Sequence, residues 1–141
     1  MNRFHVNLAV TNVAESAEFY TKLFGAEPVV RKDDYAKWLL DDPQLNFSIA
    51  HSSQASGIQH LGLQVDSRSS LGELRQRVVA SGGERFDEGE TTCCYAQSDK
   101  SWVADPQGVE WEAFYTHGES ETFSGSTEEA KTETPCCEPN S

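Results

Sequence analysis

Apolar and polar residues alternate over two short stretches of the chain. Residues 5–10 read HVNLAV and residues 60–65 read HLGLQV, so both fit the pattern H-x-x-L-x-V. Such alternation is typical of a strand whose side chains divide between two faces. We therefore predict two equivalent strands, in which His5 and His60 occupy the same position near the start.

A pattern of helical spacing follows the first strand. Asn12 is suited to cap a helix, with Glu15 three positions later, and Gly25 is suited to end it. The apolar residues between them recur every three or four positions, at Val13, Ala17, Tyr20 and Phe24. The sequence therefore predicts one amphipathic helix directly after the first strand.

The second strand is followed by a similar helical pattern. Ser70 and Glu73 resemble a capping box, and the pair Gly82-Gly83 is a stop signal. The apolar stripe consists of Leu71, Leu74 and Val78. The residues after each helix also correspond, because FGAEPV at 24–29 matches SGGERF at 81–86.

Three strand-like segments separated by polar turns follow each helix. In the first copy they cover about 27–32, 35–41 and 45–50, and in the second about 84–90, 95–104 and 109–115. The turn DPQG at 105–108 is the strongest of the turn signals. The predicted order is βαβββ twice, an α+β domain at 1–117 with repeats at about 1–52 and 57–117.

Composition restricts the possible partners. The chain has 141 residues, which suits one domain, and a net charge of −12, which disfavours nucleic acid and anionic membranes. Its N-terminal region lacks the apolar stretch of a signal peptide, so we expect a cytoplasmic protein. The cysteines form two adjacent pairs, Cys93-Cys94 and Cys136-Cys137, unlike a secreted disulfide framework. Reduced thiols and a small-molecule partner are therefore expected.

The last residues differ in composition from the rest. Residues 118–141 contain six acidic residues and one lysine, with almost no apolar periodicity. Such a segment cannot offset the entropy lost on ordering. We predict a flexible acidic tail that carries Cys136 and Cys137.

The repeat brings candidate metal ligands into equivalent positions. Alignment of LNFS at 45–48 with VEWE at 109–112 sets Glu112 against Ser48. A single strand histidine is more often packed or hydrogen-bonded, but His5 and His60 are repeat-equivalent and can meet across a pseudo-twofold axis. The repeat relates four positions, those of His5, His60, Ser48 and Glu112, which form the corners of one site. Three of these corners carry side chains that can bind a metal. Two histidines and one carboxylate suit non-heme Fe(II) and its oxygen chemistry; Glu110, on the same strand face, is the alternative carboxylate.

These residues resemble a known superfamily. The two equivalent histidines and the segment DPQGVEWEAF, with Glu112, are similar to the vicinal oxygen chelate superfamily of glyoxalases, extradiol dioxygenases and bleomycin-resistance proteins. The resemblance covers the whole folded part. It implies a metal site at His5, His60 and Glu112.

The inner cysteine pair narrows the chemistry. Neighbouring residues of a strand point to opposite faces, so Cys93 and Cys94 can hold one atom only if the chain turns there. We therefore predict a mobile loop at residues 91–95. Two buried structural cysteines are the alternative. Paired thiolates select thiophilic centres such as As(III), Sb(III), Hg(II) or Cd(II).

The cysteine segment adds a closer resemblance. CCYA, then DKSWVADPQGVEWEAFY and a tail with a second cysteine pair, is similar to organoarsenical carbon–arsenic lyases and the allied cadmium-induced proteins. The resemblance implies that Cys93 and Cys94 bind a trivalent organoarsenical beside Fe(II), with dioxygen as co-substrate and arsenite as product. An apolar pocket for an aryl group is possible from five aromatic residues, most of them expected in the core: Trp38, Phe47, Tyr95, Trp102 and Trp111.

Two other functions stay open at this point. A glyoxalase-like lyase or isomerase would use the metal only as a Lewis acid. A sequestering protein would bind a metal or metalloid without turnover. The sequence does not distinguish alkyl from aryl arsenicals or a monomer from a homodimer.

Overall fold

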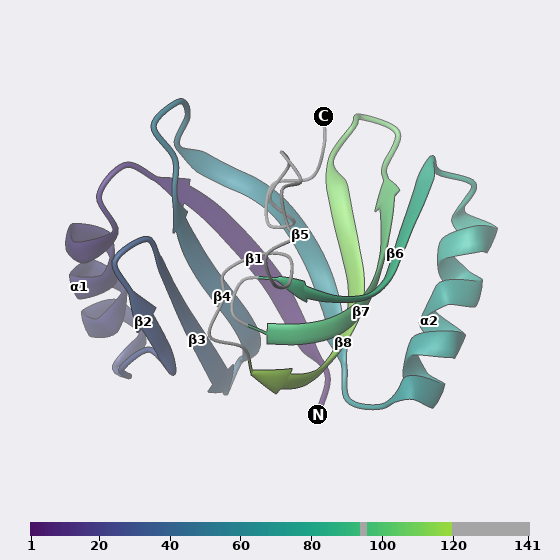
Figure 1. The fold of residues 1–141 in the computed structure, drawn as a ribbon, viewed down its shortest axis with the longest axis horizontal. Coiled ribbons are helices and arrows are strands. Elements are labelled where there is room, and N and C mark those ends of the chain that lie inside the picture. Colours follow the sequence, from purple (N-terminus) through teal and green to yellow (C-terminus); the bar gives the residue numbers. More distant parts are fainter. Residues whose placement is uncertain (94–95, 120–141) are drawn as a thin grey trace.

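The computed structural model describes the backbone of residues 1–93 and 96–119, and the side chains of residues 1–86 and 99–116. In this part the strands form one eight-stranded sheet in the order β2-β3-β4-β1-β5-β8-β7-β6. Figure 1 shows a strongly curved sheet with one helix beyond each end. No helix of the described residues is long and apolar enough to cross a membrane.

The predicted α+β repeat is confirmed, and its two copies meet at the centre of the sheet. In copy one the elements are β1 (Arg3–Val10), α1 (Val13–Phe24), β2 (Val30–Lys32), β3 (Tyr35–Asp41) and β4 (Gln44–His51). In copy two they are β5 (Gly57–Val65), α2 (Arg68–Ser81), β6 (Arg85–Cys93), β7 (Ala96–Ala104) and β8 (Glu110–Glu119). Strands β1 and β5 pair antiparallel, and each pairs parallel with the last strand of its own copy.

Both helices pack against the same side of the sheet. Helix α1 lies in a cluster formed by Val13, Ala17, Ala36, Trp38, Phe47 and Ile49. Helix α2 lies in a second cluster formed by Val65, Leu71, Leu74, Val78 and Ala113. Because successive strand residues alternate between faces, the strand residues next to those in the two clusters point to the opposite side of the sheet, which we call the inner face.

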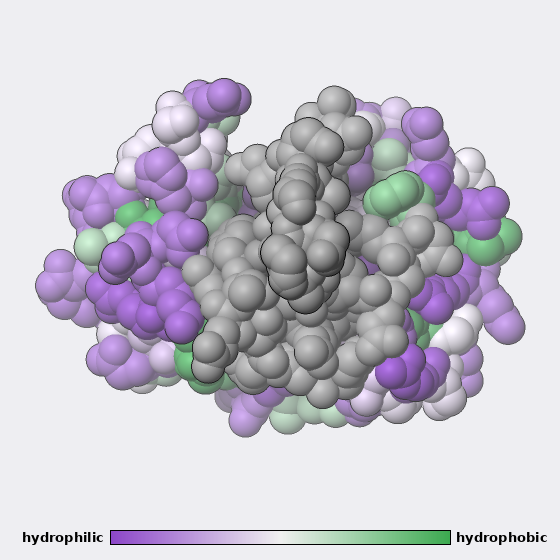
Figure 2. All heavy atoms as spheres, in the orientation of Figure 1, coloured by the Kyte–Doolittle hydropathy of each residue, from purple (hydrophilic) through white to green (hydrophobic). Residues whose placement is uncertain are grey.

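In Figure 2, hydrophilic side chains cover most of the described surface in this view.

The helix caps agree with expectation in one copy and differ in the other. The Asn12 side chain accepts a hydrogen bond from the Glu15 backbone N–H at 3.0 Å, and Gly25 ends α1 with a φ of 67°. In α2 the cap is Ser67, which accepts from the Ser70 backbone N–H at 3.1 Å. The expectation of a cap at Ser70 is wrong, because the extended backbone that a cap requires occurs three residues earlier.

Several strand bounds differ from the predicted ones. Strands β1 and β5 begin before their histidines, at Arg3 and Gly57, and β8 continues to Glu119. The expectation of a loop at residues 91–95 is wrong for its first three residues, because β6 continues to Cys93, which pairs with Ala96 of β7. Pairing with β7 satisfies backbone groups that an open loop would leave to water. Cys94 lies outside the described residues.

Candidate metal centre

The strand order places the three predicted ligands side by side. In the sheet, His5 of β1 lies opposite Gly62 of β5, and Gly62 lies opposite Glu112 of β8. His60 is two residues before Gly62, so its side chain points to the same inner face. Three adjacent strands from both copies of the repeat therefore direct their side chains to one place.

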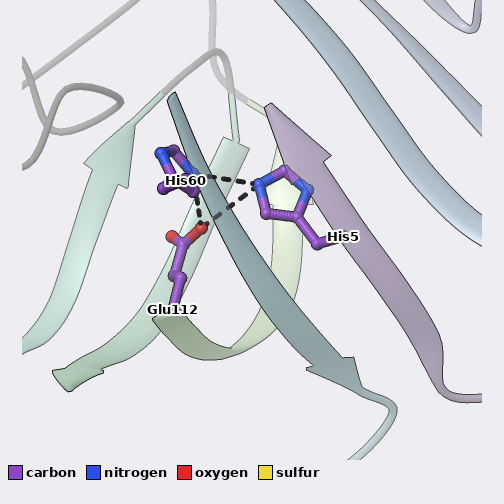
Figure 3. A group of neighbouring side chains, drawn as sticks. All are labelled: His5, His60 and Glu112. Carbon is purple, nitrogen blue, oxygen red and sulfur yellow. Dashed lines mark hydrogen bonds and ion pairs between the residues drawn. The ribbon is translucent and has the colours of Figure 1, made fainter. Parts of the chain in front are cut away.

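The donor atoms of this triad converge (Figure 3). The Nε2 atoms of His5 and His60 are 3.1 Å apart, and Glu112 Oε1 lies 3.4 Å from the first and 3.3 Å from the second. Donor atoms about 2.1 Å from one ion are about 3.0 Å apart at a right angle and about 3.4 Å apart at the tetrahedral angle. The three separations fit a common metal ion. Among the described residues, this is the group suited to hold one.

The absence of a side chain at Gly62 permits this convergence. A Cβ atom there would lie 2.7 Å from the backbone oxygen of Glu112, 3.1 Å from His5 Cδ2 and 3.2 Å from Glu112 Cβ. The first of these distances is shorter than real Cβ atoms show. Glycine at this position therefore lets β1 and β8 bring their ligands together across β5.

A buried lysine holds the carboxylate. Lys100 Nζ lies 2.7 Å from Glu112 Oε2, and the two side chains are 6% and 4% exposed. Burial by itself would raise the pKa of Glu112, but the Lys100 ammonium and the two imidazole rings outweigh it and hold that pKa well below its usual range. Glu112 is thus an anion with one oxygen on Lys100 and the other on the histidines.

Burial is the largest of the effects that lower the pKa of His5 from 6.5 to about 4. Glu112 and the Asn46 backbone oppose it, and neighbouring His60 and Lys100 act in the same direction as burial. At neutral pH the His5 ring is therefore neutral. A metal ion binds imidazole through a nitrogen lone pair, so a neutral ring beside an ionised carboxylate is the protonation state that metal binding requires.

The fourth corner of the repeat contains a hydrogen-bonded hydroxyl. Ser48 lies opposite Asn7 just as Glu112 lies opposite Gly62, which agrees with the predicted repeat equivalence. Its Oγ donates to Asn7 Oδ1 at 2.6 Å. Glu110, the alternative ligand, is half-buried and lies outside the converging group. The arrangement thus offers three ligands and leaves further coordination positions to other molecules.

The remaining predicted site residues are distributed differently. Trp38 and Phe47 belong to the α1 core, whereas the Trp102 ring lies 4.9 Å from the His60 ring and Trp111 contacts Phe4 on the other face. Among the predicted aromatic residues that the structure describes, Trp102 lines the triad. Tyr95, Cys94 and the outer pair Cys136-Cys137 lie outside the described residues, and of Cys93 only the backbone is described.

Three residues of the site were not predicted. Lys100 is a charged residue at an inward position of β7. The alternation of strand residues between the two faces was a signal that could have revealed it. Gly62 is two residues after His60, the place where copy one has Asn7. Asn46 contacts the His5 ring, and nothing in its local pattern indicates this, because the contact depends on the pairing of β1 with β4.

The fold and the triad define the class of protein. The model of the Glyoxalase/Bleomycin resistance protein/Dioxygenase superfamily matches residues 3–113, and the chain belongs to this superfamily. A solved structure of homoprotocatechuate 2,3-dioxygenase from Arthrobacter globiformis has the same fold, with a TM-score of 0.61 and 18% identity, over 83% of this chain and 36% of that one.

More similar relatives have narrower names. The chain is 46% identical over 146 residues to the "Trivalent organoarsenical cleaving enzyme" of a Bacillus species (strain MD1), covering 99% of this chain and 86% of the relative. It is 36% identical over 124 residues to the "Cadmium-induced protein CadI" of Mycobacterium tuberculosis, covering 87% and 82%. Both groups suggested by the cysteine segment are thus among its relatives.

Proposed function

We propose that this chain is a non-heme Fe(II)-dependent dioxygenase that cleaves the carbon–arsenic bond of trivalent organoarsenicals and gives arsenite. The observation that carries the proposal is the convergence of two imidazole nitrogens and one carboxylate oxygen within 3.4 Å, with a hydroxyl in the fourth corner. The substrate class comes from the relative that is 46% identical and is named for organoarsenical cleavage.

The donor set suits iron better than a thiophilic ion. Two imidazoles and one carboxylate with open positions are the ligand arrangement of non-heme Fe(II) oxygenases. Bound there, Fe(II) would supply open coordination positions for dioxygen. Lys100 keeps Glu112 turned so that one oxygen faces the histidines, and Trp102 forms an apolar wall beside His60.

The inner cysteines supply the second half of the site in this proposal. Soft thiolates bind As(III), whereas imidazole and carboxylate bind the harder Fe(II). The arsenical and the iron therefore do not compete for the same ligands. Strand β7 carries both Lys100 and Trp102 and pairs at its other end with Cys93 of β6. A substrate bound at Cys93 and Cys94 would meet the metal as an oriented neighbour rather than by collision.

Turnover of methylarsonous acid tests the proposal. Iron-loaded protein in air should produce arsenite with consumption of dioxygen, and His60→Ala should lose both stoichiometric Fe(II) binding and activity. Arsenite formation at an equal rate without dioxygen would favour a glyoxalase-like lyase or isomerase, the first alternative. Binding of the arsenical without product would favour a sequestering protein, the second.

The two cysteine pairs provide matched variants. Cys93→Ser or Cys94→Ser should abolish turnover and leave the iron bound, whereas Cys136→Ser with Cys137→Ser should leave turnover at saturating substrate close to that of the unchanged protein. Removal of residues 120–141 should do the same, and it keeps β8 whole because that strand ends at Glu119. Loss of activity in the outer variants alone would show that the substrate site was assigned to the wrong pair.

A further inference from the structure

The two histidines of the triad are held in different ways. His5 Nδ1 lies 3.0 Å from the backbone oxygen of Asn46 and 3.1 Å from its side-chain Oδ1. Both oxygens can only accept, so Nδ1 of His5 carries the proton and donates to them. The His60 residue is only 2% exposed, and its buried Nδ1 has no hydrogen-bond partner among the side chains and backbone that the structure describes.

A second amide orients the anchor of His5. Asn46 Nδ2 donates to Gln64 Oε1 at 3.0 Å, and Asn46 itself is 3% exposed. Because Gln64 Oε1 can only accept, it turns the NH₂ of Asn46 toward itself and leaves Oδ1 facing the His5 ring. Asn46 lies opposite His5 in the pairing of β1 with β4, and Gln64 extends from β5 on the other side of β1.

The anchor determines which nitrogen of His5 is free to bind a metal. With its proton on Nδ1, the neutral His5 ring presents a lone pair at Nε2, 3.1 Å from His60 Nε2. A metal ion binds imidazole through such a lone pair, so the anchor holds His5 in the tautomer that metal binding requires.

We propose that Asn46, oriented by Gln64, is a positioning residue that holds His5 as a preformed metal ligand. This inference rests on the proposed metal site and deepens it by naming the residues that orient one of its ligands.

Nuclear magnetic resonance of the ring nitrogens tests the proton assignment. We expect His5 to carry its proton on Nδ1 both in the metal-free protein and in the Zn(II)-loaded protein. Zn(II) serves as a diamagnetic probe for imidazole ligands. A proton on Nε2 of metal-free His5 would overturn the assignment.

Metal affinity tests the positioning role. Partners that orient a ligating histidine typically contribute tenfold to a hundredfold in affinity. We expect Asn46→Ala to weaken Co(II) binding about tenfold, because the backbone oxygen still accepts from His5, and Gln64→Ala to weaken it less. Asn46→Asp keeps an oxygen facing Nδ1 and should restore affinity, and the visible spectrum of Co(II) would report the coordination.

Gln59→Ala is the matched control. Gln59 Oε1 accepts from Asn7 Nδ2 at 2.5 Å, so its removal also takes an amide partner from a buried asparagine, but not from the anchor of His5. Equal loss of Co(II) affinity in Gln59→Ala and Gln64→Ala would show a merely structural effect and overturn the role. If Asn46→Ala does not fold, the comparison of these two glutamine variants decides.

The outcomes separate this inference from the proposed function. Unchanged protein that binds neither Fe(II), Co(II) nor Zn(II) would refute the metal site and with it the positioning role. Unchanged protein that binds metal, with Asn46→Ala binding equally well, would refute the positioning role alone.

Discussion

Gly62→Ala is the most direct test of how the sheet forms the triad. A Cβ atom at this position would lie 2.7 Å from the backbone oxygen of Glu112, and that neighbour cannot rotate away as a flexible side chain could. Gly62 does not have the positive φ that favours glycine, so the expected cost arises from lack of space. Strand β8 must move away from β5 by at least a few tenths of an ångström, and Glu112 moves with it.

Two magnitudes follow from that displacement. Overpacking in a well-packed region typically costs about 1–3 kcal/mol of folding free energy. Metal–ligand distances are held to within about 0.2 Å, so a larger displacement of Glu112 weakens its bond to the ion. We therefore expect Gly62→Ala to lower the free energy of unfolding by about 1–3 kcal/mol and to weaken Co(II) binding by about tenfold or more.

Gly72→Ala is the matched control. Gly72 lies in α2, and a Cβ atom there meets nothing within 4 Å. Alanine in a helix is favoured over glycine by about 0.5–1 kcal/mol, so this variant should be more stable with unchanged metal affinity. Chemical denaturation with chelator present measures stability, and chelator competition measures Co(II) affinity. If Gly62→Ala has the stability and affinity of the unchanged protein, the close approach across β5 is not what positions Glu112.

Three further predictions follow from the site. Ser48→Glu should place a carboxylate in the fourth corner, tighten Co(II) binding and lower turnover by at least about tenfold, because it fills an open position; tight binding with full activity would contradict this. Lys100→Met should destabilise the metal-free protein by about 3–5 kcal/mol by leaving Glu112 buried without its partner, and bound metal should restore part of the loss in thermal unfolding. Burial lowers the pKa of His5 from 6.5 to about 4, so between pH 6.5 and 4 this imidazole binds a proton in the unfolded metal-free chain but not in the folded one. The free energy of unfolding should therefore fall by about 3 kcal/mol as the pH is lowered through this range. It should fall by less in His5→Gln, which lacks the titrating ring. Equal pH dependence of urea unfolding in that variant would contradict the assignment to His5.

The local pattern of the chain was enough to predict the two repeats and the three candidate ligand positions that the structure brings together. Period-two alternation and helical spacing are properties of consecutive residues, so both helices and most of the strands were predicted near their observed bounds. Equivalence between the copies selected His5, His60 and Glu112, because residues at matched positions meet where the copies pair. The errors concern places where another partner decides: Ser67 competed with Ser70 for the cap, and pairing with β7 extended β6 to Cys93.

What surrounds the ligands was decided only by the tertiary structure. The contact of Lys100 with Glu112 and the contact of Asn46 with His5 depend on which strands are neighbours and in which register they pair. Gly62 matters because β5 lies between β1 and β8. Such contacts join residues far apart in the chain, and a shift of register by one residue would turn each side chain to the other face of the sheet. The alternation of β7 indicates only that Lys100 points inward, and its partner, like that of Asn46, follows from the register. The candidate ligands could therefore be predicted from the repeat, whereas these contacts required the tertiary structure.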